Sequence, residues 1–262
     1  MRNLAKLTDW LMIRSNLQRW RAAAGRRLLN LSAPCQADDW RPSLIASLHD
    51  DQATQKFSAL KNVLEAVNDA SNLLLRETDG CRDSRFFNVF PGEHYRLLAG
   101  LIHVWSPQLL FDIGTFTGMS ARVMLDCAPA CAIIHSFDLL PWNDFPTHLS
   151  SADFSSGRLF QHLQNLAQLD IFYFWLPQLQ LADIIFCDGL KDGLFEPAFL
   201  SFLAAASLQK RPRWLLLDDV RFLQMIDLWR RIDSPKIDLT SFGHWSGTGL
   251  VDISNGFKLR AL

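Results

Sequence analysis

The stretch "LLFDIGTFTGMSARVML", from Leu109 to Leu125, changes from a strand pattern to a helix pattern within a few residues. Its beginning is a short apolar run typical of a buried strand, and its end suits a helix. Gly114 and Gly118 lie at the join, shortly after Asp112. Glycine permits a tight turn out of a strand, and the free N–H groups at a helix start can bind an anionic or polar group. The stretch therefore predicts a ligand-binding strand–loop–helix unit.

Further apolar runs alternate with helical stretches along the rest of the chain. Four of them are "CAIIHSFD" (131–138), "DIFYFWL" (170–176), "ADIIFCD" (182–188) and "RWLLLDD" (213–219). Because they are apolar almost throughout, they suit parallel strands that helices cover on both faces. Two last runs, "IDLTSFG" (237–243) and "GLVDIS" (249–254), are too close together for a crossover helix. We expect them to form an antiparallel hairpin at the edge of an α/β sheet.

Acidic residues close four of the five expected parallel strands. They are Asp112, Asp138, Asp188 and the pair Asp218–Asp219. The carboxyl ends of parallel strands share one edge of a sheet, and ligands bind there at a topological switch point. Aspartate is also a common turn residue, but its repetition at four strand ends favours a site. At the end of the second strand, the Asp138 carboxylate could accept hydrogen bonds from the ribose hydroxyls of an adenosine.

Two of these segments resemble motifs of the class I S-adenosylmethionine-dependent methyltransferases. "FDIGTFTGMSA" is similar to their first motif, and "HSFD" is similar to the acidic end of their second strand. The resemblance covers residues 89–254 and implies a Rossmann-like sheet of seven strands, mostly parallel with an antiparallel last strand. It also implies S-adenosylmethionine as the cofactor. The residues that it places at the cofactor are Asp112, Gly114, Thr115, Gly118, Asp138 and Asp188.

Within this class, the chain is most similar to the metal-dependent O-methyltransferases that act on small molecules. Their fourth strand ends in Asp, with Lys three residues later, and their fifth strand ends in Asp-Asn or Asp-Asp; here these positions are Asp188, Lys191, Asp218 and Asp219. The resemblance implies that the three aspartates bind Mg²⁺, that Lys191 is the general base, and that a hydroxyl of a small molecule is the acceptor. Hard oxygen ligands suit Mg²⁺, and three clustered carboxylates would repel one another without a cation.

Three other residues are weaker candidates for the site. Glu93 and Tyr95 precede the first strand, where the related enzymes close over the cofactor, and His244 lies before the final hairpin.

Two other functions stay open, a nucleotide-cofactor oxidoreductase and a methyltransferase-like scaffold that binds without catalysing. The glycine loop lacks the G-x-G-x-x-G order of dinucleotide-binding proteins. We expect no nucleic-acid partner, because the site-bearing part is acidic overall and has no basic stripe interleaved with aromatic residues.

Residues 1–85 are expected to form a helical N-terminal extension to a methyltransferase domain at 86–262. Residues 1–30 carry seven basic side chains against one acid and predict a basic amphipathic helix. We expect this helix to pack on its own chain or in a homo-oligomer; a membrane-surface helix and a transit peptide are the alternatives. Residues 47–77 predict a second helix, with Asp50 or Asp51 as its cap. Its apolar residues at helical spacing are Phe57, Leu60, Leu64, Val67 and Leu73 to Leu75.

Composition narrows the class of protein further. The chain has 262 residues, of which 49% are hydrophobic and 20% charged, as in globular proteins. No apolar run reaches the ~18 residues that a membrane span needs. The five cysteines are scattered and form no C-x-x-C pair, so neither a disulfide framework nor a zinc ribbon is indicated. This cysteine usage favours a reducing cytoplasm.

Overall fold

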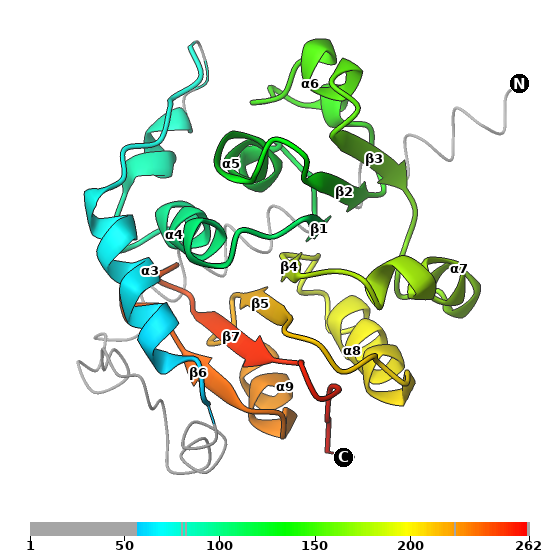
Figure 1. Cartoon of the computed structure of the whole chain (residues 1–262). Coiled ribbons are helices and arrows are strands. Elements are labelled where there is room, and N and C mark those ends of the chain that lie inside the picture. Colours follow the sequence, from blue (N-terminus) through cyan, green and yellow to red (C-terminus); the bar gives the residue numbers. More distant parts are fainter. Residues whose placement is uncertain (1–56, 80, 82, 223, 261–262) are drawn as a thin grey trace, which may run out of the picture. The chain divides into compact units, whose positions relative to one another are not determined.

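The computed structural model describes residues 57–260, except for residues 80, 82 and 223. These residues build a seven-stranded sheet in the order β3-β2-β1-β4-β5-β7-β6 (Figure 1). The strands are β1 (Leu109–Ile113), β2 (Ile133–Asp138), β3 (Leu159–Leu163), β4 (Ile184–Cys187), β5 (Trp214–Asp218), β6 (Lys236–Asp238) and β7 (Thr248–Asp252). The first five are parallel, whereas β7 runs antiparallel between β5 and β6. The mostly parallel sheet and the antiparallel edge hairpin are therefore confirmed.

Helices cover both faces of this sheet (Figure 1). They are α3 (Leu60–Asn72), α4 (Tyr95–Trp105), α5 (Met119–Cys127), α6 (Ser151–Ser155), α7 (Leu169–Leu179), α8 (Phe195–Ala205) and α9 (Met225–Arg231). Single 3₁₀ turns are η2 (Ser84–Asn88), η3 (Trp142–Asp144) and η4 (Thr240–Phe242). Alternate residues of the strands enter two separate cores, so Leu110 packs on the side of α3–α5 and Phe111 on the side of α7–α9. This burial on both faces explains why the strands are apolar throughout.

One predicted strand is wrong. The run "DIFYFWL" lies inside α7, and the third strand is Leu159–Leu163, which we did not predict. In α7 the buried side chains are Phe172, Trp175 and Leu179, which recur at helical spacing. Aromatic residues on the exposed side of α7 hide that spacing, since Tyr173 and Phe174 face solvent. The strand β3 carries polar residues and lies at the edge of the sheet, so it lacks the apolar signature of the inner strands.

The predicted extension is described only from residue 57 onward. The basic helix of residues 1–30 and the cap at Asp50 or Asp51 lie outside the described residues. The predicted apolar face is confirmed only in part: Val67 packs against the core, whereas Leu60 and Leu64 are exposed. The buried residues of α3 are the small Val63, Ala66 and Ala70. Small residues allow α3 to approach α4 closely: a Cβ on Gly100 would lie only 2.2 Å from the carbonyl oxygen of Ala66. This helix thus shares the hydrophobic core of the sheet.

The part of the chain that the structure describes contains no helix long and apolar enough to cross a bilayer.

Candidate functional site

The glycine loop between β1 and α5 is held between the ends of β2 and β4. The amides of Gly114 and Thr115 both donate to the carbonyl of Phe137, at 2.9 and 3.1 Å. Gly114 has φ +108°, and a Cβ there would lie 2.1 Å from the backbone oxygen of Asp188. The turn at Gly114 therefore requires glycine on two counts. Gly118, with φ +78°, precedes α5, and the place of its missing Cβ is taken by the Leu149 side chain.

Asp112 lies beneath this loop. Its side chain is fully buried, and its two oxygens accept hydrogen bonds from the hydroxyls of Ser120 and Ser136, at 2.7 and 2.6 Å. Burial raises the pKa of Asp112 to about 7, although the two serine hydrogen bonds act in the opposite direction. The hydroxyls of Ser136 and Thr115 are also hydrogen-bonded, at 2.6 Å. This network fastens the loop to β2 and α5, so Asp112 is placed to support the loop.

Asp138 closes β2 beside the same loop. Its carboxylate accepts hydrogen bonds from the amides of Phe116 at 2.8 Å, Leu139 at 2.7 Å and Leu140 at 3.1 Å. A carboxylate offers about four acceptor positions, so about one remains for a further donor. The side chain is only partly buried, and that position can reach a ligand.

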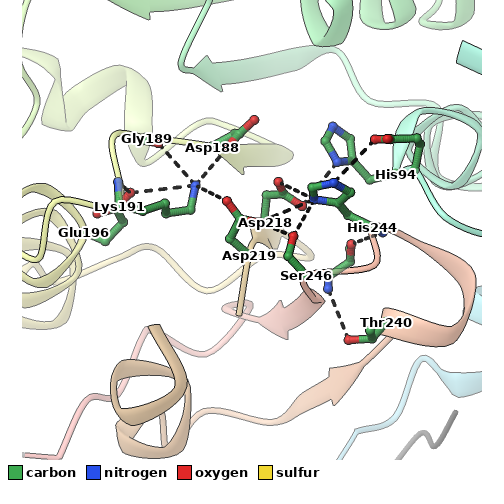
Figure 2. Close-up of polar contacts among 12 residues, drawn as sticks. His94, Asp188, Gly189, Lys191, Glu196, Asp218, Asp219, Thr240, His244 and Ser246 are labelled. Carbon is green, nitrogen blue, oxygen red and sulfur yellow. Dashed lines mark hydrogen bonds and ion pairs between the residues drawn. The ribbon is translucent and has the colours of Figure 1, made fainter. Parts of the chain in front are cut away.

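The three predicted metal ligands converge at the ends of β4 and β5 (Figure 2). Oxygen atoms of Asp188, Asp218 and Asp219 all lie within 4.8 Å of one another. Asp219 has φ +61°. Aspartate and asparagine tolerate this left-handed conformation better than most residues. The backbone thus gives a physical reason for either residue at this position.

Lys191 points into the same carboxylates (Figure 2). Its Nζ lies 2.8 Å from Asp188 Oδ1 and 3.7 Å from Asp219 Oδ2. Glu196, which was not predicted, lies 3.8 Å from Nζ on the opposite side. Burial lowers the pKa of Lys191, but these carboxylates outweigh it and hold the pKa above the ordinary value. In this arrangement Lys191 is an ammonium ion within an acidic cluster.

Two histidines complete the site, and the sequence pointed to only one of them. His244 Nδ1 lies 3.2 Å from Asp218 Oδ2 and 2.7 Å from the hydroxyl of Ser246. Burial lowers the pKa of His244, but hydrogen bonds to Asp218 and Asp219 and the nearby Glu93 raise it to about 11. His94 Nδ1 lies 3.2 Å from the other oxygen of Asp218. The sequence pointed to its neighbours Glu93 and Tyr95, and only the tertiary structure places His94 beside Asp218.

Backbone strain is concentrated at this edge of the sheet. The described part of the chain contains four non-glycine residues with positive φ, and three of them, Phe116, Lys191 and Asp219, follow β1, β4 and β5. Each such conformation costs about 1–3 kcal/mol and clusters at functional sites in other proteins. The strained residues therefore indicate that this edge carries a function.

Comparison with known proteins finds similarity at the level of structure. No protein-family model matches the sequence, and no curated protein matches it. A methyltransferase from Geobacter sulfurreducens is 19% identical, over 63% of this chain and 77% of its own, with a TM-score of 0.42. The SAH-bound methyltransferase PaMTH1 from Podospora anserina is 14% identical, over 81% and 94%, with a TM-score of 0.44. A proposed O-methyltransferase from Klebsiella pneumoniae is 16% identical, over 82% and 97%, with a TM-score of 0.41.

The chain has the class I methyltransferase fold. This statement rests on the sheet itself, which has seven strands, mostly parallel with an antiparallel last strand, as the sequence resemblance implies. Identities below 20% and TM-scores below 0.5 transfer no residue role and no activity to this chain.

Proposed function

We propose that this protein is an S-adenosylmethionine-dependent methyltransferase that methylates a hydroxyl of a small molecule with the help of Mg²⁺. One observation carries the proposal: the glycine loop, Asp138 and the carboxylate cluster lie at the same edge of the sheet. The loop follows β1 and the cluster follows β4 and β5, and β1 and β4 are the neighbours between which the strand order reverses. In open α/β sheets, ligands bind at this position.

The loop and Asp138 suit the nucleoside part of the cofactor. The backbone at Gly114 has no side chain to exclude a ligand, and the remaining acceptor position of Asp138 matches a ribose hydroxyl. Asp112 and Thr115 hold the loop in place through hydrogen bonds to serine hydroxyls. The absence of a side chain at Gly118 leaves space for Leu149. S-Adenosylmethionine carries an activated methyl group on a sulfonium, so the protein's main task is to align an acceptor oxygen with that methyl.

The carboxylate cluster fits a divalent cation with oxygen ligands. Asp188, Asp218 and Asp219 offer oxygens close enough for one coordination sphere, and Asp218 is buried. Carboxylates are the ligands that Mg²⁺ prefers. When bound there, Mg²⁺ would supply Lewis acidity that makes an acceptor hydroxyl easier to deprotonate.

Lys191 is the proposed acceptor of the hydroxyl proton, at Nζ. The ion pair with Asp188 keeps the amine protonated in the present arrangement, so Lys191 can act as a base only when the carboxylates release it. Replacement by methionine separates this role from a purely structural one, because a loss of turnover without loss of cofactor binding requires a chemical role.

Transfer of a labelled methyl group from S-adenosylmethionine to a panel of catechol and sugar hydroxyls tests the function. We expect transfer that a chelator abolishes and Mg²⁺ restores. Full turnover in chelator would refute the metal and leave the cofactor proposal standing, whereas a chain that does not bind S-adenosylhomocysteine would refute the methyltransferase itself.

A further inference from the structure

His94 is a buried imidazole that faces Asp218. The residue is 3% exposed, and its Nδ1 lies 3.2 Å from Asp218 Oδ1 as an ion pair. Its other ring nitrogen, Nε2, is buried without a hydrogen-bond partner. The contact places a nitrogen ligand beside a carboxylate that also belongs to the cluster of Asp188, Asp218 and Asp219.

The spacing of the surrounding groups fits a metal ion. His94 Nδ1 and His244 Nδ1 each lie 3.2 Å from an oxygen of Asp218, and one atom from each of the three residues lies within 4.8 Å of the others. Ligand atoms about 2.0–2.1 Å from a tetrahedral ion are about 3.3 Å apart, and those around an octahedral ion about 3.0 Å apart. The two 3.2 Å separations are close to the spacing of ligand atoms on one ion, and they involve the two different oxygens of Asp218.

The two histidines are held in this position by their backbones. Gly92 donates to the carbonyl of Gly243 at 3.0 Å, and the amide of Trp245 donates back to Gly92 at 3.1 Å. The segments that carry His94 and His244 are therefore hydrogen-bonded to each other, although they lie far apart in the sequence. The ring of His94 also packs against Phe186, with 4.9 Å between ring centroids. Such a rigid arrangement positions ligands with little entropy to lose on binding.

We propose that His94, Asp218 and His244 form a second metal position, which binds a divalent transition-metal ion such as Zn²⁺, Cu²⁺ or Co²⁺. Imidazole nitrogen suits these ions, whereas Mg²⁺ and Mn²⁺ prefer oxygen ligands. The site shares Asp218 with the carboxylate cluster of Asp188, Asp218 and Asp219 (Figure 2). The proposal goes beyond the proposed function, because it concerns binding of an ion and does not require methyl transfer.

Calorimetric titration with Zn²⁺, together with the visible spectrum of the Co²⁺-loaded chain, tests the proposal. We expect wild-type protein to bind one Zn²⁺ tightly and to give the spectrum of histidine-bound cobalt. His244→Gln and His94→Gln each remove a ligand and should weaken Zn²⁺ binding at least about 100-fold. A matched control should keep the wild-type spectrum: His103→Gln removes an exposed histidine of α4.

Pulsed electron paramagnetic resonance of the wild-type chain loaded with one equivalent of Cu²⁺ tests the same ligands without a variant, in case His94→Gln fails to fold. Coupling to imidazole nitrogen is the expected result. Absence of that coupling, no Zn²⁺ binding by wild type, or unchanged Zn²⁺ affinity in a folded His244→Gln would each overturn the proposal. Binding of S-adenosylhomocysteine, measured on the same samples, reports separately on the proposed function.

Discussion

Replacing Gly114 by alanine perturbs the loop at its tightest point. The new Cβ would lie 2.1 Å from the backbone oxygen of Asp188, whereas ordinary contact begins at 3.4 Å. That oxygen belongs to the chain directly after β4, so no flexible side chain can move aside. The loop after β1 or the end of β4 must shift by about 1 Å. A misplacement of that size can lower the turnover rate of an enzyme about 100-fold. The left-handed backbone adds about 1–3 kcal/mol of strain.

Gly157→Ala is the matched control for this change. Gly157 also has positive φ, at +70°, but a Cβ there meets nothing within 4 Å. The control should therefore lower the free energy of unfolding by about 1–2 kcal/mol and leave S-adenosylhomocysteine binding unchanged. Gly114→Ala should lower the free energy of unfolding by more than the control and weaken binding at least about 100-fold by calorimetry. A folded Gly114→Ala protein with wild-type affinity would refute the placement of the cofactor on this loop.

Three further variants test the residues around the loop. Asp138→Ala should weaken S-adenosylmethionine binding by about 1.5–3 kcal/mol, the range for a charge-assisted hydrogen bond, and unchanged calorimetric affinity in a folded variant would exclude Asp138 from the site. The pKa of Asp112 is about 7 when folded against 3.8 in the unfolded chain, so its stabilising contribution is complete below pH 3.8 and is lost as the pH rises through 7. This loss of stability is about 4 kcal/mol, and Asp112→Asn should remove the pH dependence that it causes. The same pH dependence of the free energy of unfolding in both proteins, measured with denaturant, would contradict the assignment. Lys191→Met should spare cofactor binding and slow turnover ~10²–10⁴-fold, and turnover at the wild-type rate would rule out a base at this position.

The sequence predicts the inner part of this fold well, because strands buried on both faces leave a continuous apolar signature. The runs at β1, β2, β4 and β5 carry it, and the parallel arrangement follows from the helical stretches between them. The signature fails where one face of a helix is exposed and yet aromatic, as in α7. It also fails at the edge strand β3, whose polar residues do not need to be buried.

The candidate site was predictable to the extent that topology determines it. Acids at the ends of neighbouring parallel strands must lie close together, and Asp188, Asp218 and Asp219 do so. His94 was not predictable, because its place beside Asp218 depends on hydrogen bonds between two loops far apart in the sequence. The role of Asp112 also depends on tertiary contacts. Its position in the motif suggests a ligand contact, but only the structure shows that two serine hydroxyls donate to its oxygens.

The central claim is that the loop at Gly114 and the carboxylate of Asp138 bind S-adenosylmethionine, and parallel calorimetric titrations of the purified chain with S-adenosylhomocysteine and with NAD test it most directly. The account predicts saturable binding of one S-adenosylhomocysteine per chain, a tenfold or greater loss of that affinity in Asp138→Ala, and no binding of NAD. Binding of NAD without S-adenosylhomocysteine would contradict the account and favour an oxidoreductase, and binding of neither would favour a scaffold without catalysis.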